Sequence, residues 1–112
     1  MLTLLDEQVP VEFADVLNEA ALERHVIRTV ADMGWRGTKN GELLRRTREA
    51  GFGVILTADR HIEHQQNIAR SGVGLVVMHP GRVRIQELIP LAAAVLKALD
   101  MVQPGQVLHV RP

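Results

Sequence analysis

Acidic side chains follow two apolar segments of this 112-residue chain. Asp6 closes the segment Leu2–Leu5, and Asp59 comes two residues after the segment Phe52–Thr57. If both segments are strands of a parallel sheet with the order 2-1-3-4-5, they are neighbours and both carboxylates face one crevice. Two negative charges in one crevice repel each other and destabilise the fold unless a cation neutralises them. Mg²⁺ and Mn²⁺ are cations that bind oxygen ligands. The pair predicts a divalent-metal site, whereas either acid alone could simply cap the next helix.

Few other side chains could carry chemistry. The chain has no cysteine and no tyrosine, and its only serine, Ser71, lies outside any nucleophile-elbow motif. No Walker-type phosphate loop occurs, and the stretch Gly72-Val73-Gly74 precedes an apolar segment instead of following one. Thirteen basic and thirteen acidic residues cancel, so no overall field attracts nucleic acid, although a local patch could. Carboxylates, histidines and amides remain as the candidates.

The segments that must position these groups alternate in type, and 46% of the residues are apolar, enough to bury a core. The expected strands are Leu2–Leu5, His25–Val30, Phe52–Thr57, Val73–Met78 and Val107–Val110. The expected helices are Val9–Ala21, Asn40–Ala50, His61–Arg70 and Ile85–Leu99. Strands that are apolar on both faces and separated by helices form a parallel sheet covered on both sides. We therefore expect a three-layer, doubly wound α/β fold with about five mostly parallel strands, in a single domain covering residues 1–112.

The longest apolar run does not suit a membrane span. It reaches from Ile85 to Leu99 and is interrupted by Gln86, Glu87 and Lys97. The apolar stretch at the amino terminus is too short for a signal peptide and lacks a basic flank. We expect a cytoplasmic protein that does not bind membranes, in which apolar positions of the last helix could serve a homodimer interface.

Two further groups of polar residues could contact a substrate. Arg36 and Lys39 supply a small positive patch, although surface charges of this kind usually do nothing specific. Gln65, Gln66 and Asn67 could contact phosphate or sugar, or could instead tie down a neighbouring loop through hydrogen bonds.

Several short motifs occur together along the chain. They are Leu4-Leu5-Asp6-Glu7-x-x-Pro10, Trp35-x-Gly37, Asn40-Gly41-Glu42-Leu43-Leu44, Leu56-Thr57-Ala58-Asp59-Arg60-His61 and Gln65-Gln66-Asn67. In combination the chain resembles PIN-like proteins related to the VapC-type toxin ribonucleases, and most specifically a bacterial family of unknown function. The resemblance covers nearly the whole chain. It implies a PIN-like fold and metal-dependent cleavage of RNA.

The resemblance also implies roles for individual acids. The first acid of such sites corresponds to Asp6 and the third to Asp59. The middle acid corresponds to Asn40, where an aspartate is usual and where Glu42 could substitute. A second aspartate of the last motif is replaced here by His61.

These assignments give a candidate site. The expected catalytic residues are Asp6, Glu42 and Asp59, and the expected ligands of Mg²⁺ or Mn²⁺ are Asp6, Asp59, Glu42 and Glu7. The expected contacts to RNA are Asn40, Arg36, Lys39, Arg60, Gln65 and Gln66.

Three functions stay open. The favoured one is a ribonuclease, which could be the toxin of a toxin–antitoxin pair with a small antitoxin as its partner. The second is a degenerate PIN-like module that binds RNA or protein without cutting, as Asn40 and His61 suggest. The third is a receiver-type phosphoacceptor domain, which also places acids after strands one and three. A receiver, however, needs a lysine at the end of the fifth strand, where this chain has Val107–Val110, and Thr or Ser where Met78 stands.

Overall fold

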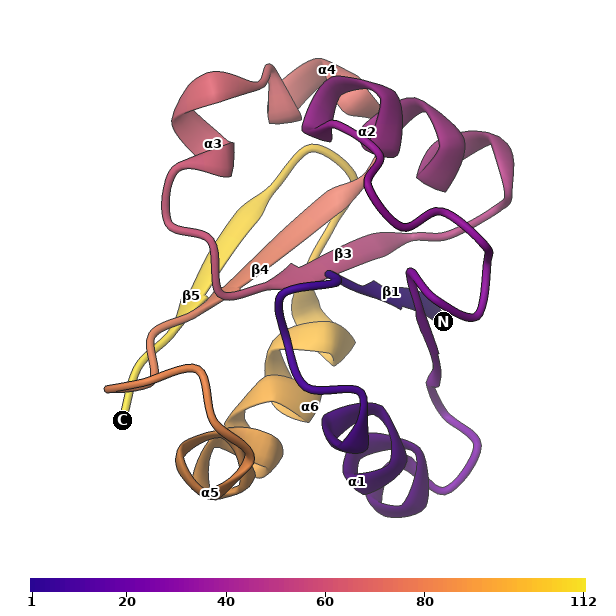
Figure 1. The fold of residues 1–112 in the computed structure, drawn as a ribbon. Coiled ribbons are helices and arrows are strands. Elements are labelled where there is room, and N and C mark those ends of the chain that lie inside the picture. Colours follow the sequence, from indigo (N-terminus) through magenta and orange to yellow (C-terminus); the bar gives the residue numbers. More distant parts are fainter.

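A five-stranded parallel sheet forms the centre of the protein (Figure 1), which is described here by a computed structural model covering residues Met1–Pro112. Its strands are β1 (Leu2–Leu5), β2 (Val26–Thr29), β3 (Val54–Thr57), β4 (Gly74–Met78) and β5 (Val107–Val110). They are arranged in the order β2-β1-β3-β4-β5, and every neighbouring pair is parallel. This arrangement confirms the predicted α/β class, and the strand order is the one assumed when the two acids were paired.

Helices cover both faces of the sheet and complete three layers, as Figure 1 shows. One face carries α2 (Asn40–Glu49), α3 (Ile62–Gln65) and α4 (Ile68–Ser71). The other carries α1 (Glu12–Ala21), α5 (Ile85–Leu88), a 3₁₀ turn (Ile89–Leu91) and α6 (Ala92–Met101). None of these helices combines the length and the apolar character that a membrane crossing requires.

The sheet separates two hydrophobic clusters, because successive side chains of a strand point to opposite faces. In β3, Leu56 contributes to the cluster that includes Phe13 of α1 and Leu99 of α6. The preceding residue, Ile55, contributes to the second cluster, together with Leu43 of α2. All four residues of β3 are buried, as expected for a central strand covered on both sides.

The helix predicted over His61–Arg70 is wrong as a single element. Two short helices, α3 and α4, replace it, and they are separated at Gln66 and Asn67. Gln66 has an extended backbone, with φ −125° and ψ 150°. The side-chain oxygen of Asn67 then accepts a hydrogen bond from the backbone N–H of Arg70 at 3.3 Å and caps α4. Gln66 therefore ends α3, and Asn67 starts α4.

Two other predicted helices have different limits in the structure. The first helix begins at Glu12 and not at Val9, because the N–H of Val9 donates to the carbonyl of Asp6 and closes a turn after β1. The apolar run that starts at Ile85 divides into α5, the 3₁₀ turn and α6. Pro90 lies in the 3₁₀ turn, where a residue without an N–H is tolerated better than inside a longer helix.

The sheet has two edge strands, β2 and β5. In β2, Ile27 and Thr29 point inward and are buried, while Val26 and Arg28 are exposed. The edge at β2 therefore presents a charged side chain to solvent.

Candidate functional site

The two acids singled out in the sequence lie at the carboxyl ends of neighbouring strands. Asp6 follows β1, and Asp59 comes two residues after β3. Both line one cavity of about 700 Å³, and none of its eleven lining residues is hydrophobic. The structure thus brings together the two carboxylates that the sequence pattern paired.

Thr57, the last residue of β3, joins the two acids. Its hydroxyl donates a hydrogen bond to Oδ2 of Asp6 at 2.8 Å, across 51 positions of sequence. The same hydroxyl oxygen accepts a hydrogen bond from the backbone N–H of Asp59 at 2.9 Å. Thr57 is fully buried, so this link is shielded from water. The hydroxyl of Thr57 therefore connects the carboxylate of Asp6 to the backbone of Asp59.

The carboxylate of Asp6 is held in an unfavourable electrostatic environment. It is only 8% exposed, and burial raises its pKa from the ordinary value. Hydrogen bonds from Thr57 and from the backbone N–H of Glu7 lower the pKa, while the negative charges of Asp59 and Glu7 raise it further. No cationic side chain forms an ion pair with any of these three acids. A bound cation would relieve the repulsion among them.

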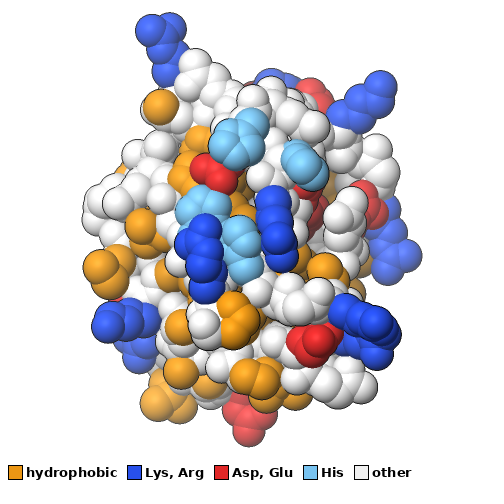
Figure 2. All heavy atoms as spheres, turned by 90° about the vertical axis from the view of Figure 1, so that its left-hand side faces the viewer, with side chains coloured by type: hydrophobic (Ala, Val, Ile, Leu, Met, Phe, Trp, Pro, Cys, Tyr) orange, Lys and Arg blue, Asp and Glu red, His pale blue; other side chains and the backbone are white.

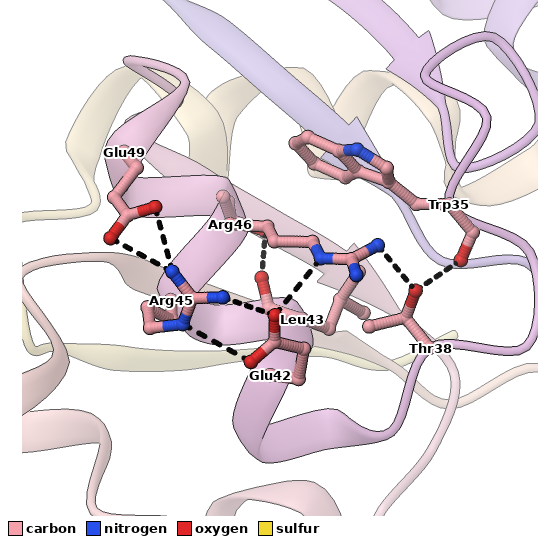
Figure 3. A network of polar contacts seen from close by, with 8 residues as sticks. Trp35, Thr38, Glu42, Leu43, Arg45, Arg46 and Glu49 are labelled. Atoms are coloured by element: carbon pink, nitrogen blue, oxygen red, sulfur yellow. Dashed lines mark hydrogen bonds and ion pairs between the residues drawn. The ribbon is translucent and has the colours of Figure 1, made fainter.

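The second helix supplies the opposite wall of the cavity, but its acid already has partners. Asn40 and Glu42 lie in the first turn of α2 and line the cavity. Figure 3 shows the carboxylate of Glu42 held by the guanidinium groups of Arg45 and Arg46 on the same helix. Hydrogen bonds from Arg45, then from Arg46, lower the pKa of Glu42. As a catalytic residue or metal ligand, Glu42 stays a prediction that requires these arginines to release it.

The remaining predicted contacts are divided between two hollows. Lys39, Gln65 and Gln66 line the same cavity as the two acids. Arg36 instead lines an adjacent hollow of about 300 Å³, which Asp6 and Glu7 also reach. Arg60 lines neither hollow.

The loop before α2 is anchored on the protein core. Glu7 accepts a hydrogen bond from the backbone N–H of Gly37 at 3.0 Å, and Gly37 has the positive φ of 78° that glycine tolerates. The Trp35 ring packs edge to face against Phe52 at a centroid distance of 6.1 Å. Thr38 donates to the carbonyl of Trp35 and accepts from Arg46, as Figure 3 shows. This loop, which contributes Thr38 and Lys39 to the cavity wall, is therefore tied to three other parts of the chain.

Some residues of the site were not predicted from the sequence. Thr57 is the most important of them, and the available signal was a polar residue ending an apolar strand two positions before an acid. The other unpredicted lining residues are Gln8, Thr38 and Gly41.

The residues present fit a hard divalent cation that keeps much of its water. Asp6 and Asp59 offer carboxylate oxygens, which Mg²⁺ and Mn²⁺ prefer, and Mg²⁺ commonly binds through only one or two carboxylates. No three acidic or histidine side chains lie close enough together to enclose a metal ion by themselves. The predicted ligand set of Asp6, Asp59, Glu42 and Glu7 therefore stays a prediction.

Searches among protein-family models, curated proteins and solved structures find no match for this chain. Only the site itself can therefore indicate a function.

Proposed function

We propose that this protein is a divalent-metal-dependent ribonuclease of the PIN-like kind. The observation that carries the proposal is the pair Asp6 and Asp59, which Thr57 links in one polar cavity without a cationic partner. Open α/β sheets bind ligands at the carboxyl ends of their parallel strands, and these two carboxylates lie there. The repulsion between them favours a cation, and a cation held by two carboxylates is suited to phosphate chemistry.

The chain's own residues supply the parts of a phosphodiester hydrolysis. Asp6 and Asp59 would hold Mg²⁺ or Mn²⁺, and the bound metal would lower the pKa of a water molecule and stabilise charge on phosphate oxygens. Thr57 holds the carboxylate of Asp6 and the backbone N–H of Asp59 through one hydroxyl, which helps to fix this part of the site before substrate binds. From other parts of the cavity wall, the ammonium group of Lys39 and the amide of Gln66 are available to position phosphate and sugar.

A cleavage assay tests this proposal directly. The purified protein is incubated with structured RNAs and Mn²⁺, and we expect cleavage that Asp6→Asn and Asp59→Asn abolish while circular dichroism shows an intact fold. Asp15→Asn provides the matched control, because Asp15 is an exposed carboxylate on α1 away from the cavity. Equal cleavage by the wild type and both site variants would identify a contaminating nuclease and refute the proposal.

A degenerate binding module is the second candidate, and specific observations favour it. Asn40 and His61 stand where the resemblance expects acids, and Glu42 is engaged by two arginines. No group of three ligands is assembled. Intact RNA in the assay above, together with Mn²⁺ binding by calorimetry that Asp6→Asn removes, would favour this candidate.

The toxin role is a further part of the proposal, and it has its own test. A ribonuclease toxin should arrest growth when it is expressed in a bacterial host, and Asp59→Asn should relieve the arrest. A small antitoxin encoded beside it should do the same and should copurify with the chain.

A further inference from the structure

Away from the candidate cavity, ionisable side chains from three segments meet at the carboxyl ends of β4 and β5. His79 directly follows β4, and its Nε2 lies 2.7 Å from Nδ1 of His109 in β5. The other ring nitrogen of His109, Nε2, lies 2.9 Å from a carboxylate oxygen of Glu63 in α3. His64, also in α3, lies 3.8 Å from the same carboxylate. The three segments are thus connected by a chain of polar contacts.

Two arginines complete this group. Arg111 follows Val110, whose carbonyl accepts the backbone N–H of His79 at 2.9 Å, and Arg60 lies just before α3. The charges of both arginines contribute to the lowered pKa of His79. Figure 2 looks onto this end of the molecule and shows histidine side chains gathered on the surface with cationic side chains beside them. The group is named the histidine patch hereafter, and its members are Arg60, Glu63, His64, His79, His109 and Arg111. Glu63 is its one acid, so the patch is locally cationic although the chain as a whole has no net charge.

The contacts between the rings determine where protons can be. Glu63 can only accept when ionised, so its contact favours a proton on Nε2 of His109. Nδ1 of His109 then accepts the N–H of Nε2 of His79. When His79 is neutral, its Nδ1 carries no proton. If Nδ1 takes up a proton, the ring becomes positively charged and gains a second N–H donor.

The same geometry does not suit a metal ion. The ring centroids of His79 and His109 are 5.0 Å apart while the facing nitrogens are 2.7 Å apart, so the two nitrogens point straight at each other. Two metal ligands would instead converge on a common point between them. No three side chains of the patch are arranged as a ligand set.

The patch lies on the same edge of the sheet as the candidate cavity. The cavity is at the ends of β1 and β3, and the patch is at the ends of β4 and β5. Two strand spacings separate β3 from β5, or about 10 Å. One RNA strand that runs along this edge can therefore contact the cavity and the patch at the same time.

We propose that the histidine patch binds a backbone phosphate of the RNA strand whose neighbouring phosphate occupies the candidate cavity. This inference rests on the proposed function and adds to it a second, metal-independent phosphate subsite. Arg60 and Arg111 supply guanidinium groups, and each guanidinium can donate two parallel hydrogen bonds to two oxygens of a phosphate. His79, half-buried and in contact with His109, has one ring nitrogen free of these contacts, Nδ1, and this nitrogen becomes a donor once it is protonated.

Binding at the patch should also take up protons. Burial, followed by the positive charges of Arg111, Arg60 and His109, lowers the pKa of His79, and only Glu63 opposes this effect. A bound phosphate would counteract the lowering, so RNA should bind more tightly as the pH falls toward about 5.

The experiment measures fluorescence anisotropy of a labelled single-stranded RNA in EDTA, where metal-dependent cleavage is blocked. We expect the double variant Arg60→Gln, Arg111→Gln to weaken binding roughly tenfold and to lower the slope of log affinity against log salt by about 1. Both arginines are exposed, so the fold should survive these changes. Arg28→Gln is the matched control, because this exposed arginine lies on the opposite edge strand, β2, and its loss should leave affinity unchanged. His79→Gln should flatten the pH dependence.

Other results of the same experiment overturn the inference. Binding that is absent, or equal in the wild type and the double variant, refutes the subsite even if Mn²⁺-dependent cleavage is intact. Tight binding of Zn²⁺ or Ni²⁺ that His79→Gln removes, without an effect of the arginine changes on RNA, would make the patch a metal site. Conversely, patch-dependent binding by a protein that never cuts RNA would support the subsite while the proposed nuclease fails.

Discussion

Replacing Thr57 by valine tests the link between the two acids. Valine has nearly the same shape as threonine, so the change removes the hydroxyl that donates to Asp6 and accepts from the N–H of Asp59 without opening a cavity. A hydrogen bond to a charged group contributes about 1.5–3 kcal/mol to stability. The unfolding entropy is about 2.1 cal/mol/K per residue, which gives about 0.24 kcal/mol/K for 112 residues. We therefore expect the melting temperature of Thr57→Val to fall by about 6–13 °C at neutral pH.

The pH dependence makes this prediction specific to Asp6. The hydrogen bond from Thr57 lowers the pKa of Asp6, so it stabilises the ionised form, and the variant should raise that pKa further. The stability difference between wild type and variant should be largest above the pKa of Asp6 and should shrink as the pH falls through it. Thermal melts in EDTA, recorded between about pH 7 and about pH 4, measure this change.

Thr57→Ser is the matched control. It keeps the hydroxyl and loses only a buried methyl group, which costs about 1 kcal/mol or somewhat more. Its deficit relative to wild type should not change with pH. A Thr57→Val protein as stable as wild type, or a deficit that is constant from neutral to acidic pH, would refute the role assigned to the hydroxyl.

Three further predictions concern stability. Burial and neighbouring charges raise the pKa of Asp6, so its ionised form is unfavourable in the folded protein. Asp6→Asn should therefore be more stable than wild type in thermal melts at neutral pH, by about 1.4 kcal/mol for each pKa unit of the shift. This gain in stability should vanish as the pH falls through the pKa of Asp6. Gly74→Ala should lower denaturant stability by about 1–3 kcal/mol, because its Cβ would lie 2.8 Å from a methyl group of Val102 in a packed core. The hydrogen bond from His25 lowers the pKa of Asp100. The stability that this hydrogen bond contributes should be present above the ordinary pKa of 3.8 and should be lost as the pH falls below it. Thermal melts of Asp100→Asn over the same pH range should lack this pH dependence.

The sequence predicted the α/β class from its own pattern, whereas the meeting of the two acids also required an assumed strand order. Uninterrupted apolar runs such as β3 and β4 are typical of parallel strands buried on both faces, and helices between them force crossovers. Once the strand order is known, Asp6 and Asp59 must lie near the same crevice, because each follows the carboxyl end of a neighbouring strand. That part of the prediction depends on chain topology and not on side-chain conformation.

The parts that the sequence did not predict depend on local competition between interactions. Glu42 lies three residues before Arg45 and four before Arg46, a spacing that favours ion pairs along a helix as readily as it allows a metal ligand. Side-chain conformation decides between them, and in the structure the arginines hold the carboxylate. The pairing of His79 with His109 requires the register of β4 against β5, which nothing in either segment reveals.

The division of the helix predicted over His61–Arg70 has a similar origin. Its residues suit a continuous helix, yet Asn67 caps α4 and Gln66 is drawn to the cavity wall beside Gly41. A Cβ at Gly41 would lie 3.4 Å from the side-chain oxygen of Gln66. Tertiary contact therefore overrides helix propensity at this point.

The exposed Arg28 on edge strand β2 has a consequence for self-association. Two copies of the chain that extended their sheets through β2 around a two-fold axis would bring equivalent strands together and place their Arg28 side chains near each other. Like charges opposed across a strand pair are destabilising, and natural sheets use charged edge residues to prevent this kind of growth. Any dimer of this protein should therefore avoid pairing at the β2 edge.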